Sequence, residues 1–584
     1  MSGFVAAVSL TGDTTRPVEE ARRLAGHYRA VRGTAARVAE AGRDTPAAAV
    51  ALGTDLTCDA DGWTVVQGPA LGPRSHPLEP ADLAATDGQF AALSWDPVRR
   101  RFLAATDAFA TAPVYVARRG SLLYLSSSAM VLACHLRPPV STVGLRQFLV
   151  TGSQYGPHTH WEGVRRLEPG TLLEVVGDRV SERVHWQPEP DPSVEALDLP
   201  AAVDLMLDAV VGGLQQRLGG RPSWVDLTGG FDSRLMALMA ERAGVELATY
   251  TRESSIHPDV AMARDIARRR EWPWRELRVP WDWQDRLPDL VDGALAAGDG
   301  RLEVLQLARV AWGHRELARR VPRLVSGGGG EQLMDRMWLT EQPRPDTRQP
   351  HLERWVRVVA SRAIEQDVLA PGSVERTRET ILELVRPVAA RYADEPASRQ
   401  LDACYAYKSS GHFGAYRAAD DLELEAHLPY YWKAGFAVSF AIDRRHRTGH
   451  KLSRHMLERL DPQIAALPTT RGGPAAPMRL TTAHRHLPFY LLMARKTVNK
   501  TAQLTVGRTP FPLPKAFGWP EPASNTAVVD RLRSSGVLDS RELRIRTMLS
   551  DEGVRRLETL DLSGRMLGRL LTAELALART GTEL

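Results

Sequence analysis

The chain has 584 residues, which is too long for one hydrophobic core and predicts two to four domains. Hydrophobic residues make up 43% and charged residues 25%, as in ordinary globular proteins, and a net charge of +5 does not indicate nucleic-acid binding. The three cysteines lie far apart, so neither a zinc site nor a disulfide framework is expected. No basic segment precedes the short apolar run at the N-terminus, so no signal peptide is expected. No stretch approaches the ~20 apolar residues of a membrane helix, and we expect a cytoplasmic protein without membrane or nucleic-acid partners.

The first part of the chain is predicted to be mostly β. Short apolar runs such as FAALSW, RFLAAT and SLLYLSS alternate with turn residues. The stretch QPEPDPSVEALDLP (187–200) then carries four prolines and no periodicity, which is typical of a linker. We place a domain boundary in this stretch and predict one domain over 1–190 and a second over 191–584.

The second domain is predicted to begin with an alternation of helices and strands. An amphipathic helix over 201–218 precedes a short buried strand at 223–227, a glycine turn and a helix over 235–244. A strand at 247–251 and a helix over 260–270 follow, and this alternation predicts a parallel sheet. The rest of the chain is predicted to add helices.

A glycine loop stands where the first of these strands ends, in the sequence LTGGFDS (227–233). Its two glycines allow close backbone approach to an anion, and the helix that follows favours negative charge at its start. Thr228 and Ser233 supply hydroxyl groups, and Asp232 supplies an oxygen ligand for Mg²⁺. The pattern favours a pyrophosphate loop, although an ordinary strand-to-helix turn capped by Asp232 and Ser233 would look the same.

A second glycine loop lies downstream in LVSGGGGE (324–331). Four consecutive glycines demand tight backbone, and Glu331 could face Asp232 as a second Mg²⁺ ligand. Taken alone, this pattern equally fits a flexible loop that ends in a helix-capping glutamate.

Together the two loops resemble the adenylating domain of asparagine synthetase and its relatives. That family has Ser-Gly-Gly-x-Asp-Ser in the first loop and Leu-Ser-Gly-Glu-Gly-Ala-Asp-Glu in the second. GQFAALSWD (88–96) and TDAFATAPVY (106–115) resemble motifs of the family's glutaminase domain, and EAHLPY (425–430) resembles its Glu-x-Arg-x-Pro-Phe. These motifs occur in the family's order along the chain.

The resemblance implies an α/β protein with two domains of known type. The first would be an Ntn-hydrolase-like αββα β-sandwich, a glutaminase-like (class II amidotransferase-like) domain. The second would be an adenine-nucleotide α-hydrolase-like (ATP pyrophosphatase) parallel-sheet domain with added helices. Glutamine-using members have a cysteine nucleophile at residue 2, whereas this chain has Ser2, so we expect no ammonia from glutamine unless Ser2 itself is the nucleophile.

Relatives that lack this cysteine include the β-lactam synthetases and the lasso-peptide macrolactam cyclases, which couple a carboxylate to an amine of the same molecule. The resemblance therefore implies an ATP- and Mg²⁺-dependent, AMP-forming carbon–nitrogen ligase that works through an acyl-adenylate and closes a macrolactam in a peptide. Gly328 stands where asparagine synthetase has Glu and β-lactam synthetase has Tyr, which would leave room for a bulky substrate.

Residue roles follow from the same resemblance. Mg²⁺ would be held by Asp232 and Glu331. The catalytic residues would be Glu425 as general base, Arg471 in place of the family's lysine, and Tyr430 beside them. The nucleotide would be bound by Leu227, Thr228, Gly229, Gly230, Asp232, Ser233, Thr249, Tyr250, Ser326 and Gly327.

Other functions stay open. The substrate would be a peptide or an amino-acid derivative, with a leader-peptide-binding protein and a protease as further partners. Alternatives are a small-molecule amide or β-lactam synthetase, an ammonia-using asparagine synthetase-like enzyme, and a sulfurtransferase-like ATP pyrophosphatase, against which the first domain argues. A non-catalytic binding descendant is the last alternative, because Gly328 and Gln332 depart from the family's second loop.

Overall fold

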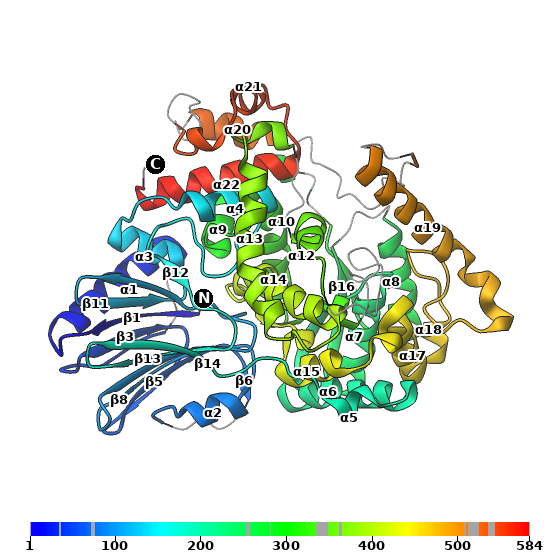
Figure 1. Ribbon diagram of the computed structural model, residues 1–584, viewed down its shortest axis with the longest axis horizontal. Helices are drawn as coiled ribbons and strands as arrows, with labels where there is room; N and C mark the ends of the chain where they lie inside the picture. The colour runs from blue at the N-terminus through cyan, green and yellow to red at the C-terminus, as the bar shows by residue number, and fades with distance from the viewer. Residues whose placement is uncertain are drawn as a thin grey trace.

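The structure is a computed structural model that describes residues 2–33, 37–71, 76–252, 257–278, 280, 282–333, 349–360, 365–506, 510–511, 525–534 and 543–582. Figure 1 shows stacked sheets in blue and cyan beside a larger, mostly helical part in green to red. The first part thus agrees with the β-rich domain predicted from the alternating runs.

Two six-stranded antiparallel sheets form the N-terminal part. The first has the order β12 (Arg165–Arg166), β10 (Tyr115–Arg119), β11 (Leu122–Ser126), β1 (Gly3–Ser9), β3 (Ala47–Leu52) and β2 (Val38–Ala41). The second has the order β14 (Arg179–Val184), β13 (Thr171–Val176), β9 (Arg101–Thr106), β8 (Ala91–Asp96), β5 (Gly62–Gln67) and β4 (Asp55–Asp59).

The two sheets share one apolar core, and strand periodicity explains how. In β1, Phe4 and Ala6 face the second sheet, where Trp63 and Phe102 pack against them. Val5, next to Phe4 in the strand, points the other way and joins a separate core. Because successive side chains of a strand alternate between faces, β1, which is apolar except for Ser9, is buried on both sides.

Helices cover both outer faces of these sheets. Over the first sheet lie α1 (Arg16–Arg32) and α3 (Ala129–Leu136), whose apolar residues pack on Val5 and its neighbours. Over the second lies the short α2 (Pro80–Ala85), whose Leu83 contacts an apolar cluster that includes Leu103. A two-stranded ribbon, β6 (Ala70–Leu71) and β7 (Asp87–Gly88), flanks α2.

The predicted parallel sheet is present in the C-terminal part. Its five strands are all parallel, in the order β17 (Trp274–Glu276), β16 (Glu246–Thr251), β15 (Pro222–Asp226), β18 (Arg323–Val325) and β19 (Glu425–His427). The chain winds outward from β15 in one direction and then returns to build β18 and β19 on the other side. The strand order therefore reverses between β15 and β18, and open α/β sheets bind ligands at such a point.

Helices surround this sheet. Those that matter for the site are α6 (Leu199–Leu218), α7 (Phe231–Arg242), α8 (Pro258–Arg269), α14 (Ala397–Asp420), α15 (Lys433–Ala441), α17 (Lys451–Leu460) and α19 (Ala483–Val506). The remaining longer helices are α9 (Trp283–Gly298), α10 (Val304–Ala318), α13 (Ser373–Ala390), α20 (Asn525–Ser534), α21 (Asp551–Thr559) and α22 (Gly564–Thr580).

The two parts of the molecule are packed together. The C-terminal helix α22 joins the same core as α3, α9, α10 and α4 (Thr142–Thr151), and Figure 1 shows it in red beside the cyan helices. The predicted linker over 187–200 contains the short α5 (Pro192–Glu195) and the start of α6. Within the described residues, no helix has the length and apolarity needed to cross a membrane.

Candidate functional site

The two glycine loops meet where the strand order reverses. The first follows β15 and the second follows β18, and these strands are hydrogen-bonded neighbours. A Cβ atom on Gly327 would lie 3.0 Å from the Cα of Ser233, so the second loop touches the start of α7. Asp226, the last residue of β15, accepts the Gly327 backbone N–H at 2.8 Å. Burial raises the pKa of Asp226, a residue that the sequence reasoning missed.

Local hydrogen bonds shape the first loop. The Ser233 hydroxyl accepts the Thr228 backbone N–H at 3.0 Å, and the Thr228 hydroxyl accepts that of Gly230 at 3.1 Å. Asp259, in the first turn of α8, accepts the Gly229 N–H at 2.8 Å. No side chain caps the start of α7. Its first N–H groups therefore point, without a side-chain acceptor, toward the space in front of the loop.

The space beside Gly229 is filled, whereas the space beside Gly230 is largely open. A Cβ atom on Gly229 would lie 2.5 Å from the sulfur of Met262 and 2.6 Å from a methyl carbon of Thr470, so no side chain fits there. A Cβ atom on Gly230 would meet only the Thr228 hydroxyl oxygen, at 3.3 Å. The open side of the loop is thus at Gly230, next to the uncapped helix start.

Two acidic residues lie where the loops meet. The Asp232 carboxyl group lies against the backbone of Gly330, where a Cβ atom would overlap it, and Glu331 is the next residue. A buried carboxylate oxygen of Glu331, Oε2, has no hydrogen-bond partner among the described residues. No group of three or more metal-binding side chains occurs in the described ranges.

These residues fit a nucleotide phosphate with Mg²⁺, because Mg²⁺ is commonly held by one or two carboxylates together with phosphate oxygens and water. The N–H groups at the α7 start would hold the anion, and Asp232 and Glu331 would hold the metal. The ligand set predicted from the two loops is therefore consistent with their geometry.

A buried arginine that the sequence reasoning missed ties the first loop to a later segment. The Arg234 guanidinium donates to the carbonyl oxygens of Gly229 at 3.4 Å and Pro468 at 2.9 Å. The Thr470 N–H donates to the same Gly229 carbonyl at 3.3 Å. Arg471, predicted to act as a cation, is therefore held next to the loop, where it is half-buried.

Tyr430 also lies near the loops. It is buried, and its pKa is raised well above the usual range by burial and then by the charges of Asp232 and Asp226. Its hydroxyl group has no hydrogen-bond partner among the described residues. A buried hydroxyl beside Asp232 is available to a ligand, which agrees with the predicted location of Tyr430.

Two residues predicted to pack on adenine are instead committed to the sheet and its core. Thr249 is fully buried and donates its hydroxyl to the Pro273 carbonyl oxygen at 3.1 Å. The Tyr250 ring packs edge-on against Trp224 in an apolar cluster below the sheet. Tyr250 is paired in register with Asp226, near the end of the strand, but its ring and the Thr249 side chain are occupied by these contacts.

The structure places Glu425, for which we predict a general-base role, at the start of a strand and away from the glycine loops. Glu425 opens β19 and is paired in register with Arg323, the first residue of β18, whereas the glycine loop follows the last residue of β18. Parallel strands start at one edge of the sheet and end at the other. Glu425 therefore belongs to the edge opposite the loops, where its hydrogen bond from His427 lowers its pKa.

Lys408 of α14 is a charged residue near the second loop that the sequence reasoning missed. Burial lowers its pKa, and the charge of Glu331 acts in the opposite direction. Its ammonium group lies 5.5 Å from the centre of the Tyr405 ring. The composition could have pointed to this residue. The chain has only six lysines among 75 basic residues, so a lysine in a predicted helix with many apolar residues is unusual.

The start of β1 is crowded rather than open. A side-chain atom on Gly3 would overlap the Tyr28 hydroxyl and lie 2.5 Å from the Ser127 hydroxyl oxygen. The Ser2 carbonyl oxygen accepts hydrogen bonds from Tyr28 at 3.1 Å and from the Gln67 amide at 3.2 Å. Ser2 therefore lies at the strand end where the family carries its cysteine, among side chains that bind its backbone.

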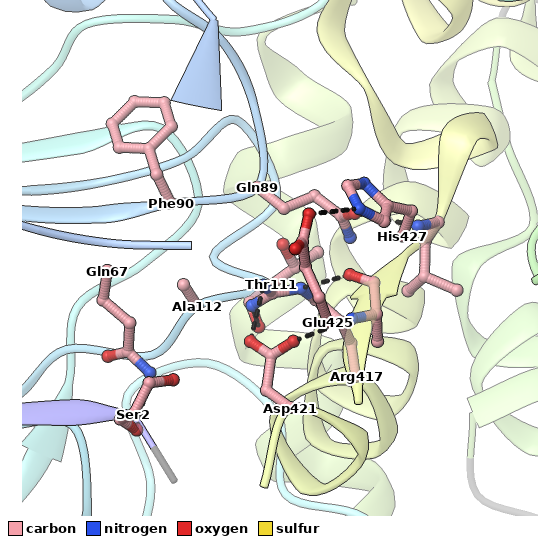
Figure 2. A network of polar contacts seen from close by, with 12 residues as sticks. Ser2, Gln67, Gln89, Phe90, Thr111, Ala112, Arg417, Asp421, Glu425 and His427 are labelled. Atoms are coloured by element: carbon pink, nitrogen blue, oxygen red, sulfur yellow. Dashed lines mark hydrogen bonds and ion pairs between the residues drawn. The ribbon is translucent and has the colours of Figure 1, made fainter. Parts of the chain in front are cut away.

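A buried polar network joins this region to β19, and Figure 2 shows its members between the two parts of the molecule. The Gln89 side-chain oxygen accepts the Leu428 backbone N–H at 2.8 Å and the Trp432 indole N–H at 3.3 Å. Arg417, fully buried, pairs with Asp421 at 2.6 Å and donates to the Thr111 carbonyl oxygen at 3.5 Å. The N-terminal part thereby holds the segment that follows β19.

Comparison with known protein families identifies one domain in this chain. A model described as a glutamine amidotransferase domain matches residues 80–186. No curated protein matches the chain.

Two solved structures are similar at low identity. One is titled the allosteric regulatory enzyme of purine biosynthesis, with 10% identity, a TM-score of 0.22, and coverage of 44% of this chain and 66% of that chain. The other is glutamine phosphoribosylpyrophosphate amidotransferase from B. subtilis complexed with ADP and GMP, with 8% identity, a TM-score of 0.20, and coverage of 47% and 91%. Likenesses of this size say nothing about activity.

The domain match and the stacked antiparallel sheets define the class. The chain is a mixed α/β protein with an N-terminal sheet domain of the Ntn amidotransferase type and a C-terminal parallel sheet. The amidotransferase-like domain indicates an enzyme of amide-forming or amidotransferase chemistry.

Proposed function

We propose that the protein is an ATP- and Mg²⁺-dependent amide-bond-forming ligase of the asparagine synthetase-like kind, which activates a carboxylate as an acyl-adenylate. The observation that carries the proposal is the meeting of two glycine loops where the parallel sheet reverses its strand order, with the Asp232 carboxyl group against Gly330, the residue before Glu331. An ordinary capped turn would not bring a second glycine loop and a second carboxylate to the same point.

The chain's own residues would divide the work as follows. The N–H groups at the start of α7 would bind the leaving pyrophosphate, and Asp232 with Glu331 would hold Mg²⁺. When bound, the metal supplies charge neutralisation at the phosphate oxygens. Arg471 and Lys408 would supply positive charge on either side of the loops, where negative charge develops. Tyr430 would donate a hydrogen bond from its buried hydroxyl.

The amine is proposed to come from the substrate, with macrolactam closure of a peptide as the reaction. Supporting this, Ser2 replaces the cysteine and Tyr28 with Ser127 crowd the start of β1, so ammonia from glutamine is not expected. Beside Gly328, a Cβ atom would lie 3.5 Å from Phe413 and 3.6 Å from Leu428. The Ser326 hydroxyl oxygen is nearest, at 3.4 Å, so one hydroxyl group and two apolar side chains border this space, which suits a peptide, although the space is narrower than the missing side chain alone suggested.

The test is pyrophosphate release from purified protein with ATP and Mg²⁺, against a panel of peptides and small amino acids. We expect release with peptide carboxylates, and its loss in Asp232→Asn but not in Asp178→Asn, which changes an exposed hairpin residue. Pyrophosphate release with small acids only would indicate a small-molecule synthetase instead of a peptide-cyclising enzyme. Release without any dependence on Asp232 would overturn the proposal.

Binding without chemistry is the second candidate, because the Asp259 carboxylate already accepts the N–H of Gly229. A carboxylate at this place competes with an anion. This candidate expects no pyrophosphate release with any substrate and no binding of ATP, and calorimetry with ATP and Mg²⁺ measures the latter directly.

A further inference from the structure

An exposed apolar stripe runs along α19. Seven of the eleven exposed large apolar side chains of the described residues lie between 478 and 511. Within α19, Leu487 and Leu491 are each 56% exposed and Val498 is 46% exposed. Together with Ala494, also exposed, they recur at spacings of four, three and four residues, so they lie on one face of the helix.

The opposite face of α19 anchors the helix to the body. Phe489 and His486 are buried, and the Arg454 guanidinium of α17 lies 5.1 Å from the centre of the Phe489 ring. Figure 1 shows α19 in orange at the edge of the molecule, near α17 and α18 (Pro462–Ala465). The apolar stripe is therefore not the packing face of this helix, and it needs another explanation.

The charge around the stripe has one sign. None of the 59 residues from 462 to 520 is acidic, and eight are Lys or Arg. Because the whole chain carries +5, the remainder carries −3. Helical spacing puts Arg495 and His484 along one side of the stripe and Tyr490 along the other. Arg495 is exposed, its guanidinium group lies 5.9 Å from the centre of the Phe511 ring, and no ion pair joins it to a carboxylate of the described ranges.

The stripe leads toward the candidate site. Gly472, at φ +84°, approaches the first turns of α19 so closely that a Cβ atom would lie 3.0 Å from Pro488. Two residues earlier, Thr470 is hydrogen-bonded to Gly229 of the first glycine loop. A ligand lying along α19 would therefore have one end at the rim of the loops.

We propose that α19 is a docking helix for an acidic, amphipathic segment of the peptide substrate, which holds the substrate while its reacting end enters the site. This inference rests on the proposed function. A helical peptide of roughly 18 residues matches the length from Leu480 to Val498 at about 1.5 Å per residue. A second copy of α19 is disfavoured as the occupant, because it would bring like charges together.

The test is fluorescence anisotropy of a fluorescein-labelled 20-residue peptide, with Leu at helical spacing and Glu at the flanking positions, without ATP. The comparison peptide has Lys in place of Glu. We expect binding of the acidic peptide only, weakening as NaCl is raised. Val498→Ser should weaken it roughly tenfold, whereas Val176→Ser, equally exposed at 46% on β13, should leave it unchanged.

Arg495→Glu provides a second variant that removes no apolar contact, and it should weaken the acidic peptide while favouring the basic one. Equal binding of both peptides, or of neither, would overturn the proposal. Two other results would also overturn it. One is cosedimentation of the protein with vesicles that contain phosphatidylserine, and the other is self-association of the protein, if Val498→Ser abolishes either. The binding assay contains no ATP, so the two proposals can fail separately. Peptide binding without pyrophosphate release would contradict the ligase function and leave the docking helix standing. Pyrophosphate release without peptide binding would contradict the docking helix alone.

Discussion

At the residue scale, the site depends on a few charged groups held in unusual surroundings. Lys408 combines a buried position, a lowered pKa and an acidic neighbour in Glu331. Buried titratable groups with a specific charge partner are enriched at functional sites. In a chain that otherwise relies on arginine, this lysine offers a compact charge that can be desolvated beside a reacting group.

Replacing Lys408 by Met should lower kcat for pyrophosphate release by about 100-fold, as removal of one electrostatic stabiliser does. The KM for ATP should change little, because Lys408 acts on the side of the second loop. Lys408→Arg should restore part of the rate, and Lys451→Met, at an exposed position, should have no effect. A fall in thermal stability with unchanged kcat would make Lys408 a structural residue.

His160 gives a pH dependence at the same scale. It is buried between the two parts of the molecule, with Nε2 at 2.7 Å from the Gly300 carbonyl oxygen, and burial lowers its pKa to about 4. Between pH 6.5 and 4 the unfolded chain binds a proton that the folded chain does not. Stability should therefore fall as the pH drops through this window, by up to about 3 kcal/mol.

Thermal unfolding followed from pH 7.5 to 4.5 checks this expectation. His160→Gln, which keeps a hydrogen-bonding side chain but cannot titrate, should flatten part of the decline. An unchanged slope in this variant would assign the acid sensitivity to other groups, such as His412, whose pKa burial also lowers to about 4.

At the scale of elements, the strand–loop–helix unit formed by β15 and α7 explains why two adjacent glycines are needed for different reasons. Gly229 is surrounded by Met262, Thr470 and Asp259, whereas Gly230 borders open space. Neither has a positive φ, so the requirement is for space rather than for a left-handed backbone.

Gly230→Ala should therefore fold like the parent and bind ATP more weakly, by about tenfold or more, because the methyl group enters the space left for the anion. Gly229→Ala should instead lower the melting temperature, since the new methyl group must displace Met262 and Thr470. Calorimetric titration with ATP and thermal unfolding separate the two effects. Equal behaviour of the two variants would contradict this account of the loop.

At the scale of the whole molecule, the amidotransferase-like part supports the C-terminal sheet. Asp87 accepts the N–H of Lys433 at the start of α15, at 2.6 Å, and Gln89 holds Leu428 and Trp432 just after β19. In the opposite direction, the Lys433 ammonium group donates a hydrogen bond to the Ala84 carbonyl oxygen at 2.8 Å, near the end of α2. The N-terminal part thus positions a strand and a helix of its neighbour.

Arg417 and Asp421, both in the C-terminal part, form a buried ion pair next to this junction, and burial raises the pKa of Asp421 to about 6. Arg417→Met should destabilise the protein by about 3–5 kcal/mol, because it leaves Asp421 buried without its partner. The double variant Arg417→Met/Asp421→Asn should recover part of this loss. The control Arg179→Met, at an exposed hairpin, should have a melting temperature near that of the parent protein. Additive effects of Arg417→Met and Asp421→Asn on stability would contradict the coupling of this pair.

Much of this architecture was readable from the sequence because it follows local rules. Alternating apolar runs predicted the antiparallel sheets, and the buried strand at 223–227 with its glycine turn predicted β15 and the α7 start. The predicted strand and helix positions lie within a few residues of β15, α7, β16 and α8. The domain boundary in 187–200, the cofactors and the partners stay predictions.

The tertiary structure decided what depends on the position of one strand relative to another. It brought Asp232 and Glu331 together, added Asp226, Arg234 and Lys408 to the site, and moved Glu425 to the opposite edge. Sequence motifs carry the order of residues but not the edge of the sheet on which each strand begins. The sequence by itself determined the two sheet types and the two glycine loops, because periodicity and turn chemistry are local. Which charged groups share the site was decided only by strand order and burial, because these depend on contacts between residues far apart in the chain.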